Sequence, residues 1–135
     1  MCYYDATGKT AGEEVSSTYE GRHLSFVESD LVHPSHDPDL VNKGDPVNIG
    51  NIVGVAFKSA AAATDLIAID TEGIWFLDVI ASDGSGTSAV VVGDDLYVDT
   101  GVVSKIATGI PFGKALSPLA GSASPAVAAV KVHMR

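Results

Sequence analysis

The chain has 135 residues and a net charge of −9, because 17 acidic residues outnumber 8 basic ones. A chain of this length most simply forms one domain with its own core, and its acidic character argues against nucleic acid as a partner. No apolar run reaches the roughly 18 residues of a membrane span. The first residues lack the basic and apolar regions of a secretory signal, so we expect synthesis in the cytoplasm.

The first third of the chain differs in composition from the rest. Residues 1–43 hold many more carboxylates than basic residues, and only Leu24–Val27 and Leu31-Val32 are apolar enough to become buried. We therefore predict that residues 1–43 form an acidic extended N-terminal arm and linker. One or two short strands and a turn-rich linker at residues 34–38 are expected within it.

From residue 44 onward, a turn motif occurs twice. Its copies are Gly44–Val47 (GDPV) and Gly93–Tyr97 (GDDLY), and each is followed later by a small-residue segment, Gly54–Ala56 or Gly113–Ala115. Glycine adopts backbone angles that other residues avoid, and an Asp carboxylate accepts hydrogen bonds from nearby amides. The repetition predicts a β domain over residues 44–135 built from two pseudo-similar halves.

The strand pattern of this domain allows two local predictions. Asp65–Asp70 and Ile74–Ile80 are apolar runs of strand length separated by Thr71–Gly73, which predicts a hairpin. Gly109–Leu116 contains Pro111, which cannot donate a ladder hydrogen bond, so we predict an edge or entering strand there. With about eight short strands and no long amphipathic helix, the predicted fold is all-β, either a jelly-roll-like β-sandwich or a small β-barrel.

The best candidate for a metal site is the segment that contains His33, His36, Asp37 and Asp39. These side chains bind divalent ions, but the intervening prolines hold the segment extended and no distant ligand completes the set. We therefore expect a solvated or partner-contacting turn and no metal. The one cysteine, Cys2, cannot form an internal disulfide or a multi-thiolate site.

No catalytic residue and no cofactor are predicted. Ser85 lies in the sequence Asp-Gly-Ser-Gly, which lacks the Gly-x-Ser-x-Gly pattern and the following helix of a nucleophile elbow. The glycines precede predicted strands and not helix starts, so no phosphate-binding loop is expected. The chain is thus predicted not to be an enzyme.

Candidate partner contacts come from the arm and from one strand. Leu24, Phe26 and Val27 are expected to add as a strand to an exposed sheet edge of a partner, with Leu31 beside them. Trp75 and its neighbour Phe76 face opposite sides of their strand. One of the two belongs in the core, and the other packs on the second sheet, the arm or a neighbouring subunit; Trp75 is our candidate for a partner contact.

Several motifs, taken in order, resemble one family. They are Lys43–Val47, Gly54–Ala56, Asp65–Gly73, Val92–Tyr97, Phe112–Leu116 and a Val-Lys-Val ending. Their order and spacing over residues 43–133 resemble the small capsid cement, or head decoration, proteins of tailed phages and prophages. The acidic arm is longer than we expect for this family, and its role stays open.

The resemblance implies a non-enzymatic β protein that binds the outside of a phage head and stabilises it. Its partners would be the major capsid protein and further copies of itself, with a homotrimer expected in preference to a homodimer. It would be located in the virion, on the capsid exterior, after synthesis in the host cytoplasm.

A second class of function stays open from the sequence. A small ligand- or carbohydrate-binding β module of a phage particle would need exposed aromatic residues beside polar loops, and only Tyr97 and Trp75 fit that description.

Overall fold

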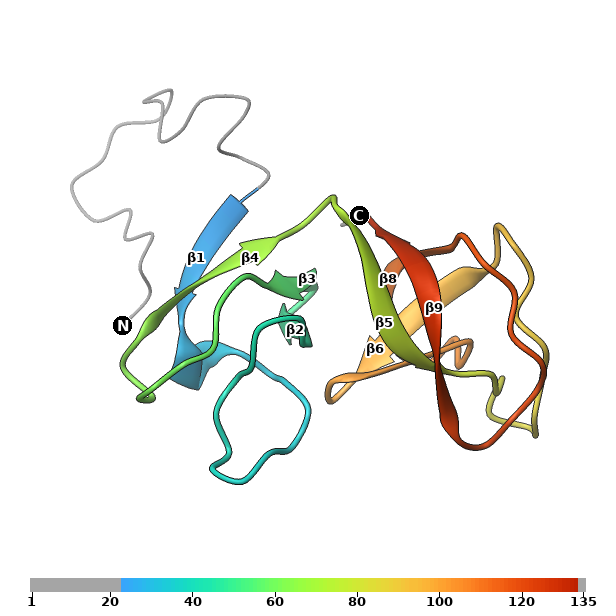
Figure 1. Cartoon of the computed structure of the whole chain (residues 1–135), viewed down its shortest axis with the longest axis horizontal. Coiled ribbons are helices and arrows are strands. Elements are labelled where there is room, and N and C mark those ends of the chain that lie inside the picture. The colour runs from blue at the N-terminus through green and yellow to red at the C-terminus, as the bar shows by residue number, and fades with distance from the viewer. Residues whose placement is uncertain (1–22, 134–135) are drawn as a thin grey trace.

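The structure, a computed structural model, describes residues 23–133. Within this range the regular structure consists of strands and almost no helix (Figure 1), which confirms the predicted all-β class. The elements are β1 (His23–Val27), the short 3-10 helix η2 (Glu28–Asp30), β2 (Pro46–Ile49), β3 (Ile52–Ala56), β4 (Leu66–Asp70), β5 (Ile74–Ile80), β6 (Asp95–Asp99), β7 (Val102–Ser104), β8 (Ile110–Ala115) and β9 (Pro125–Val132). None of the described helices is long and apolar enough for a membrane span.

The strands form two lobes that lie side by side in Figure 1. The first lobe, residues 23–70, is a four-stranded sheet in the order β1-β4-β3-β2. The second lobe, residues 74–132, is a closed barrel in the order β5-β7-β6-β8-β9, which the pairing of β5 with β9 completes. The prediction of a small barrel is thus confirmed for the second lobe.

The two lobes repeat one strand arrangement. The order β1-β4-β3-β2 in the first lobe matches β5-β9-β8-β6 in the second, and all these neighbours are antiparallel. The register matches as well. Asp70 of β4 is opposite His23 of β1 and Val55 of β3, and Lys131 of β9 is likewise opposite Ile74 of β5 and Lys114 of β8. Strand β7 is the addition that closes the second copy into a barrel.

The repeated turn motif has the same backbone geometry in both lobes. Gly44 and Gly93 have φ angles of 89° and 94°, a region that favours glycine. The N–H of Gly44 donates to the carbonyl of Ala56 at 2.9 Å, and the N–H of Gly93 donates to that of Ala115 at 2.8 Å. Each glycine therefore fastens the start of one strand to the end of its neighbour.

The aspartate of each motif accepts a hydrogen bond from the start of its own turn. Asp45 Oδ2 lies 2.7 Å from the N–H of Asn42, and Asp94 Oδ2 lies 2.9 Å from that of Val91. The Val91 N–H, with Lys105 Nζ only 3.3 Å from the carboxylate, holds the pKa of Asp94 below its usual range.

A second pair of glycines, Gly54 and Gly113, allows each of their strands to pack closely against the neighbouring strand. A Cβ built on Gly54 would lie 2.8 Å from the carbonyl oxygen of Asp70, and one built on Gly113 would meet that of Lys131 even more closely. These are matching positions in the two lobes, so the same steric requirement selects glycine twice.

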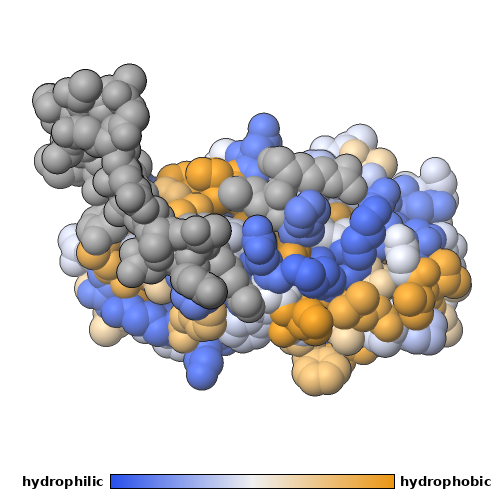
Figure 2. Space-filling model, turned by 90° about the horizontal axis from the view of Figure 1, so that it is seen from above, coloured by the Kyte–Doolittle hydropathy of each residue, from blue (hydrophilic) through white to orange (hydrophobic). Residues whose placement is uncertain are grey.

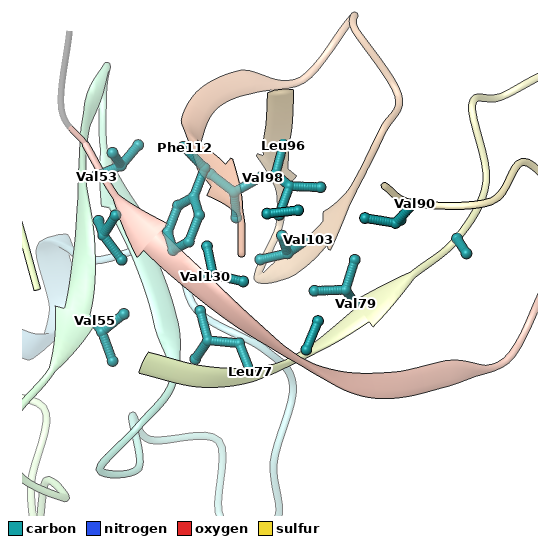
Figure 3. Close-up of a cluster of buried hydrophobic side chains, with 14 residues drawn as sticks. Val53, Val55, Leu77, Val79, Val90, Leu96, Val98, Val103, Phe112 and Val130 are labelled. Carbon is teal, nitrogen blue, oxygen red and sulfur yellow. The ribbon is translucent and has the colours of Figure 1, made fainter. Parts of the chain in front are cut away.

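The lobes have two cores that meet at β3. The first core contains Phe26, Leu31, Val41, Val47, Ala56, Ile67 and Ile69. The second core fills the barrel and extends to β3 of the first lobe. Val53 and Val55 of β3 project toward Leu77, Phe112 and Val130 of the barrel (Figure 3). Because alternate residues of a strand face opposite sides, β3 serves both cores at once.

Part of the predicted N-terminal arm lies in the first core. Phe26, Leu31 and Val41 are all buried there, against residues that follow position 44. Residues 1–22, the rest of the predicted arm, lie outside the described residues.

The predicted hairpin between Asp65–Asp70 and Ile74–Ile80 is wrong. Strand β4 pairs with β1 and β3, whereas β5 pairs with β9 and β7. The buried carboxylate of Asp70 accepts the N–H groups of Glu72 and Gly73 at 3.1 and 3.0 Å and the indole N–H of Trp75 at 3.2 Å. These bonds hold a turn that directs the chain into the second lobe.

The prediction of an edge strand at Pro111 is also wrong, because β8 lies between β6 and β9. The register of β6 against β8 shifts between Leu96 and Tyr97, and Pro111 is opposite Tyr97 at this irregularity. Proline is tolerated at such a site because the regular ladder is interrupted there.

Candidate binding surface

A groove of about 610 Å³ lies between the two lobes. The first lobe contributes residues 34–46 in part, and the second contributes side chains from β5, β7 and β9. One wall is therefore a polar turn and the other is the outer surface of the barrel.

The barrel wall of the groove is apolar and exposed. Phe76 on β5 has 80% of its surface exposed, Val127 on β9 has 63% and Val102 on β7 has 44%. Ile74, two residues before Phe76 on the same face of β5, is 66% exposed. Apolar residues also emerge among polar ones over the barrel end of the molecule in the space-filling view (Figure 2). Such a grouping of large apolar side chains is typical of a surface that binds a partner.

The opposite wall is built from the first Gly-Asp turn and the linker before it. His36 Nε2 lies 2.7 Å from Asp45 Oδ2, the same oxygen that accepts the N–H of Asn42. Lys43, in the middle of this turn, is exposed and also lines the groove. The hydrogen bond between His36 and Asp45 and the turn itself hold this wall in place opposite the barrel.

A second contact between a histidine and a carboxylate lies at the start of the linker. His33 Nε2 lies 2.9 Å from Glu28 Oε1, and both side chains are almost fully buried. The His33 and His36 rings stack with centroids 6.2 Å apart. Each histidine thus has its own carboxylate partner, and the described residues contain no group of three or more side chains suited to hold a metal.

The predicted partner residues are distributed over both lobes. Phe26 and Leu31 are buried in the first core, and Leu24 packs against that core. Val27, which is half-buried, ends β1 opposite Leu66. Trp75 packs on the barrel core and against Phe57, with ring centroids 5.6 Å apart. The structure therefore does not bring these five residues together on one surface.

A comparison with models of protein families finds a match to residues 28–132, and the family is described as phage cement protein. The chain belongs to the phage cement protein family. No curated protein and no solved structure matches it.

Membership of the phage cement family makes this chain a structural component of the virion, with a place in the phage capsid. The family supports a structural and not a catalytic role. The match extends from η2 into β9, so it covers the second lobe and all of the first lobe except β1.

Sequence reasoning missed Phe76, Val102 and Val127 as surface residues of this cement protein. The alternation along β5 indicates that Trp75 and Phe76 face opposite sides. It does not say which side is inward, because both neighbours are aromatic. The signal that decides it is Asp70, since a buried acceptor five residues before Trp75 draws the indole N–H inward.

Proposed function

We propose that this chain binds the outer surface of a phage head and stabilises the lattice of the major capsid protein. The observation that carries the proposal is the line of exposed apolar side chains beside the groove, in a chain of the cement family. Burying such side chains against a partner contributes about 25 cal/mol per Å² of apolar surface.

The proposed mechanism is mechanical. A shell under internal DNA pressure separates first at the joints between neighbouring capsomers, and a small protein that bridges these joints adds contact area there. Each contact can be modest, because several contacts made at once raise the overall affinity through effective concentration. We propose a homotrimer in preference to a homodimer, and light scattering of the purified protein distinguishes the two.

We also propose a role for the acidic arm. Its carboxylates would face basic patches of the shell, which would speed association and make it sensitive to salt. A truncation that tests this should end at residue 22, because β1 and Val41 supply part of the first core. Equal head occupancy by the truncated and the full chain would reject the arm's role.

The proposed function is tested by co-sedimentation of the purified chain with undecorated heads. We expect it to pellet with expanded heads and to stay in the supernatant with unexpanded precursors. Heated heads should also release DNA at a higher temperature once the protein is bound. A chain that stays in the supernatant with expanded heads would contradict the proposal.

A further inference from the structure

Strand β5 has one edge that is only partly paired. It pairs with β9 along its whole length, from Ile74 opposite Lys131 to Ile80 opposite Pro125. On its other side, β7 pairs only with Val79 and Ile80. Within residues 23–133 no strand pairs with the stretch Ile74–Asp78 on that side.

The ladder with β9 shows which backbone groups point to the open side. The N–H of Val132 donates to the carbonyl of Gly73 at 2.9 Å, so Gly73 and Val132 form a hydrogen-bonded pair. Such pairs alternate along an antiparallel ladder. Trp75 and Leu77 therefore bond to β9, whereas the backbone groups of Phe76 point away from it, as do those of Ile74 and Asp78.

We propose that an extended segment of the shell protein adds as a strand to this open edge of β5. The inference rests on the proposed binding to the head and names how that binding is made. Adding a strand uses backbone hydrogen bonds for affinity and side-chain pockets for selection. The exposed side chains of Phe76, Val102 and Val127 supply the apolar surface beside the edge.

The shape of the groove favours one extended segment over a second copy of the chain. The turn at residues 43–46 faces β5 from the first lobe, so the groove has two walls. The β5 of another copy has the same turn in front of it, so a second copy would have to bring its own turn into the groove before the strands could pair. A segment without a domain around it has no such obstacle.

Charge identifies the chemistry of the segment. Asp78, on the outward face of β5, is exposed and lines the groove. Lys43 lines the groove from the opposite wall, but within the described residues Asp78 forms no ion pair with it or with any other cation. The chain's own acidic segment 1–22 would bring more negative charge to this place. The occupant we infer therefore has apolar residues over Phe76 and a lysine or arginine opposite Asp78.

A proline substitution tests the edge directly. Phe76→Pro removes an N–H that points outward and leaves the ladder to β9 intact, whereas Phe76→Ala keeps the N–H and removes the ring. We expect Phe76→Pro to weaken binding to expanded heads at least tenfold and Phe76→Ala to weaken it several-fold. Asp78→Lys, which reverses the charge, should also weaken it several-fold.

The chain offers a matched control at Val92, which is 62% exposed. Val92 precedes Gly93 in a turn closed by the N–H of Asp94 on the carbonyl of Val91 at 3.1 Å, and the positive φ of Gly93 marks it as type II. Proline is favoured at this position of such a turn. Val92→Pro should therefore fold and bind heads like the unmodified chain.

The outcomes separate this inference from the proposed function. If the unmodified chain fails to bind expanded heads, the proposed function falls and the inference with it. If the unmodified chain, Phe76→Pro and Asp78→Lys all bind equally, only the inference is overturned. A change in oligomeric state caused by Phe76→Pro would show that a second copy occupies the edge of β5. Stronger binding after deletion of residues 1–22 would show that the chain's own segment occupies it. Either result would overturn the inference.

Hydrogen exchange in the free protein keeps the test valid even if Phe76→Pro does not fold. The amides of Trp75, Leu77 and Val79 should exchange slowly, and those of Phe76 and Asp78 should exchange rapidly. Slow exchange at Phe76 and Asp78 in the free chain would show that the edge is already covered, which would overturn the inference.

Discussion

Strand β1 of the first lobe and β5 of the second occupy the same place in their sheets but carry different outward residues. Phe26 in β1 and Leu77 in β5 are both buried, at matching positions of the register. On the outward side, β1 has Ser25 where β5 has Phe76. The inward residues preserve the fold in both copies, whereas the outward residues differ because they serve different surfaces.

The largest expected effect tests whether the two lobes share one steric requirement. Gly113→Ala should destabilise the protein by about 3 kcal/mol or more, because a methyl group would collide with a neighbouring backbone carbonyl. Gly54→Ala should cost somewhat less, since its methyl group would have more room. Urea unfolding measures both, with Gly86→Ala as the control, because a Cβ there meets nothing within 4 Å. Equal stability of all three variants would refute the shared requirement.

The next effect concerns Asp70, which holds the turn between the two lobes. Asp70→Ala should destabilise the protein by about 2 to 3 kcal/mol, because three buried or half-buried N–H groups lose their acceptor. Exposed Asp78 provides the control, and Asp78→Ala should leave the urea midpoint nearly unchanged. A similar small change for Asp70→Ala would mean that the turn does not depend on the carboxylate.

A smaller effect concerns the second of the two Gly-Asp turns and its dependence on pH. The pKa of Asp94 is lowered in the folded chain, so its carboxylate stabilises the fold at every pH above 3.8, the pKa of the unfolded chain. That contribution is lost as the pH falls through the folded pKa. The stability difference between the unmodified chain and Asp94→Ala should therefore be present at pH 7 and disappear in strong acid. A difference that stays constant down to strong acid would contradict this assignment.

The smallest effect on stability tests the division between inward and outward residues. Phe76→Ser, which copies the residue of the first lobe, should change the free energy of unfolding by no more than about 0.5 kcal/mol because the ring is exposed. Leu77→Ser on the inward side should be severely destabilising by comparison. A large loss of stability for Phe76→Ser would show that the ring supports the fold.

Local chemistry made some of these features predictable from the sequence. The two Gly-Asp turns were predictable because glycine and aspartate act within a few residues of themselves. The hairpin at residues 65–80 was not, because β4 and β5 each pair with strands distant in the sequence. The exposed Phe76 was missed for a related reason, since the direction of Trp75 depends on the buried Asp70.

The burial of both faces of β3 has a consequence for how the chain comes apart. Val53 and Val55 lie in one core and Ala56 in the other, so neither lobe can lose its structure without exposing apolar residues of the other. Despite its internal duplication, the protein should melt in one cooperative step, with equal calorimetric and van't Hoff enthalpies. A subunit that unfolds as a whole keeps its structure up to a single threshold of stress and does not unfold in parts, which suits a protein that stabilises a capsid.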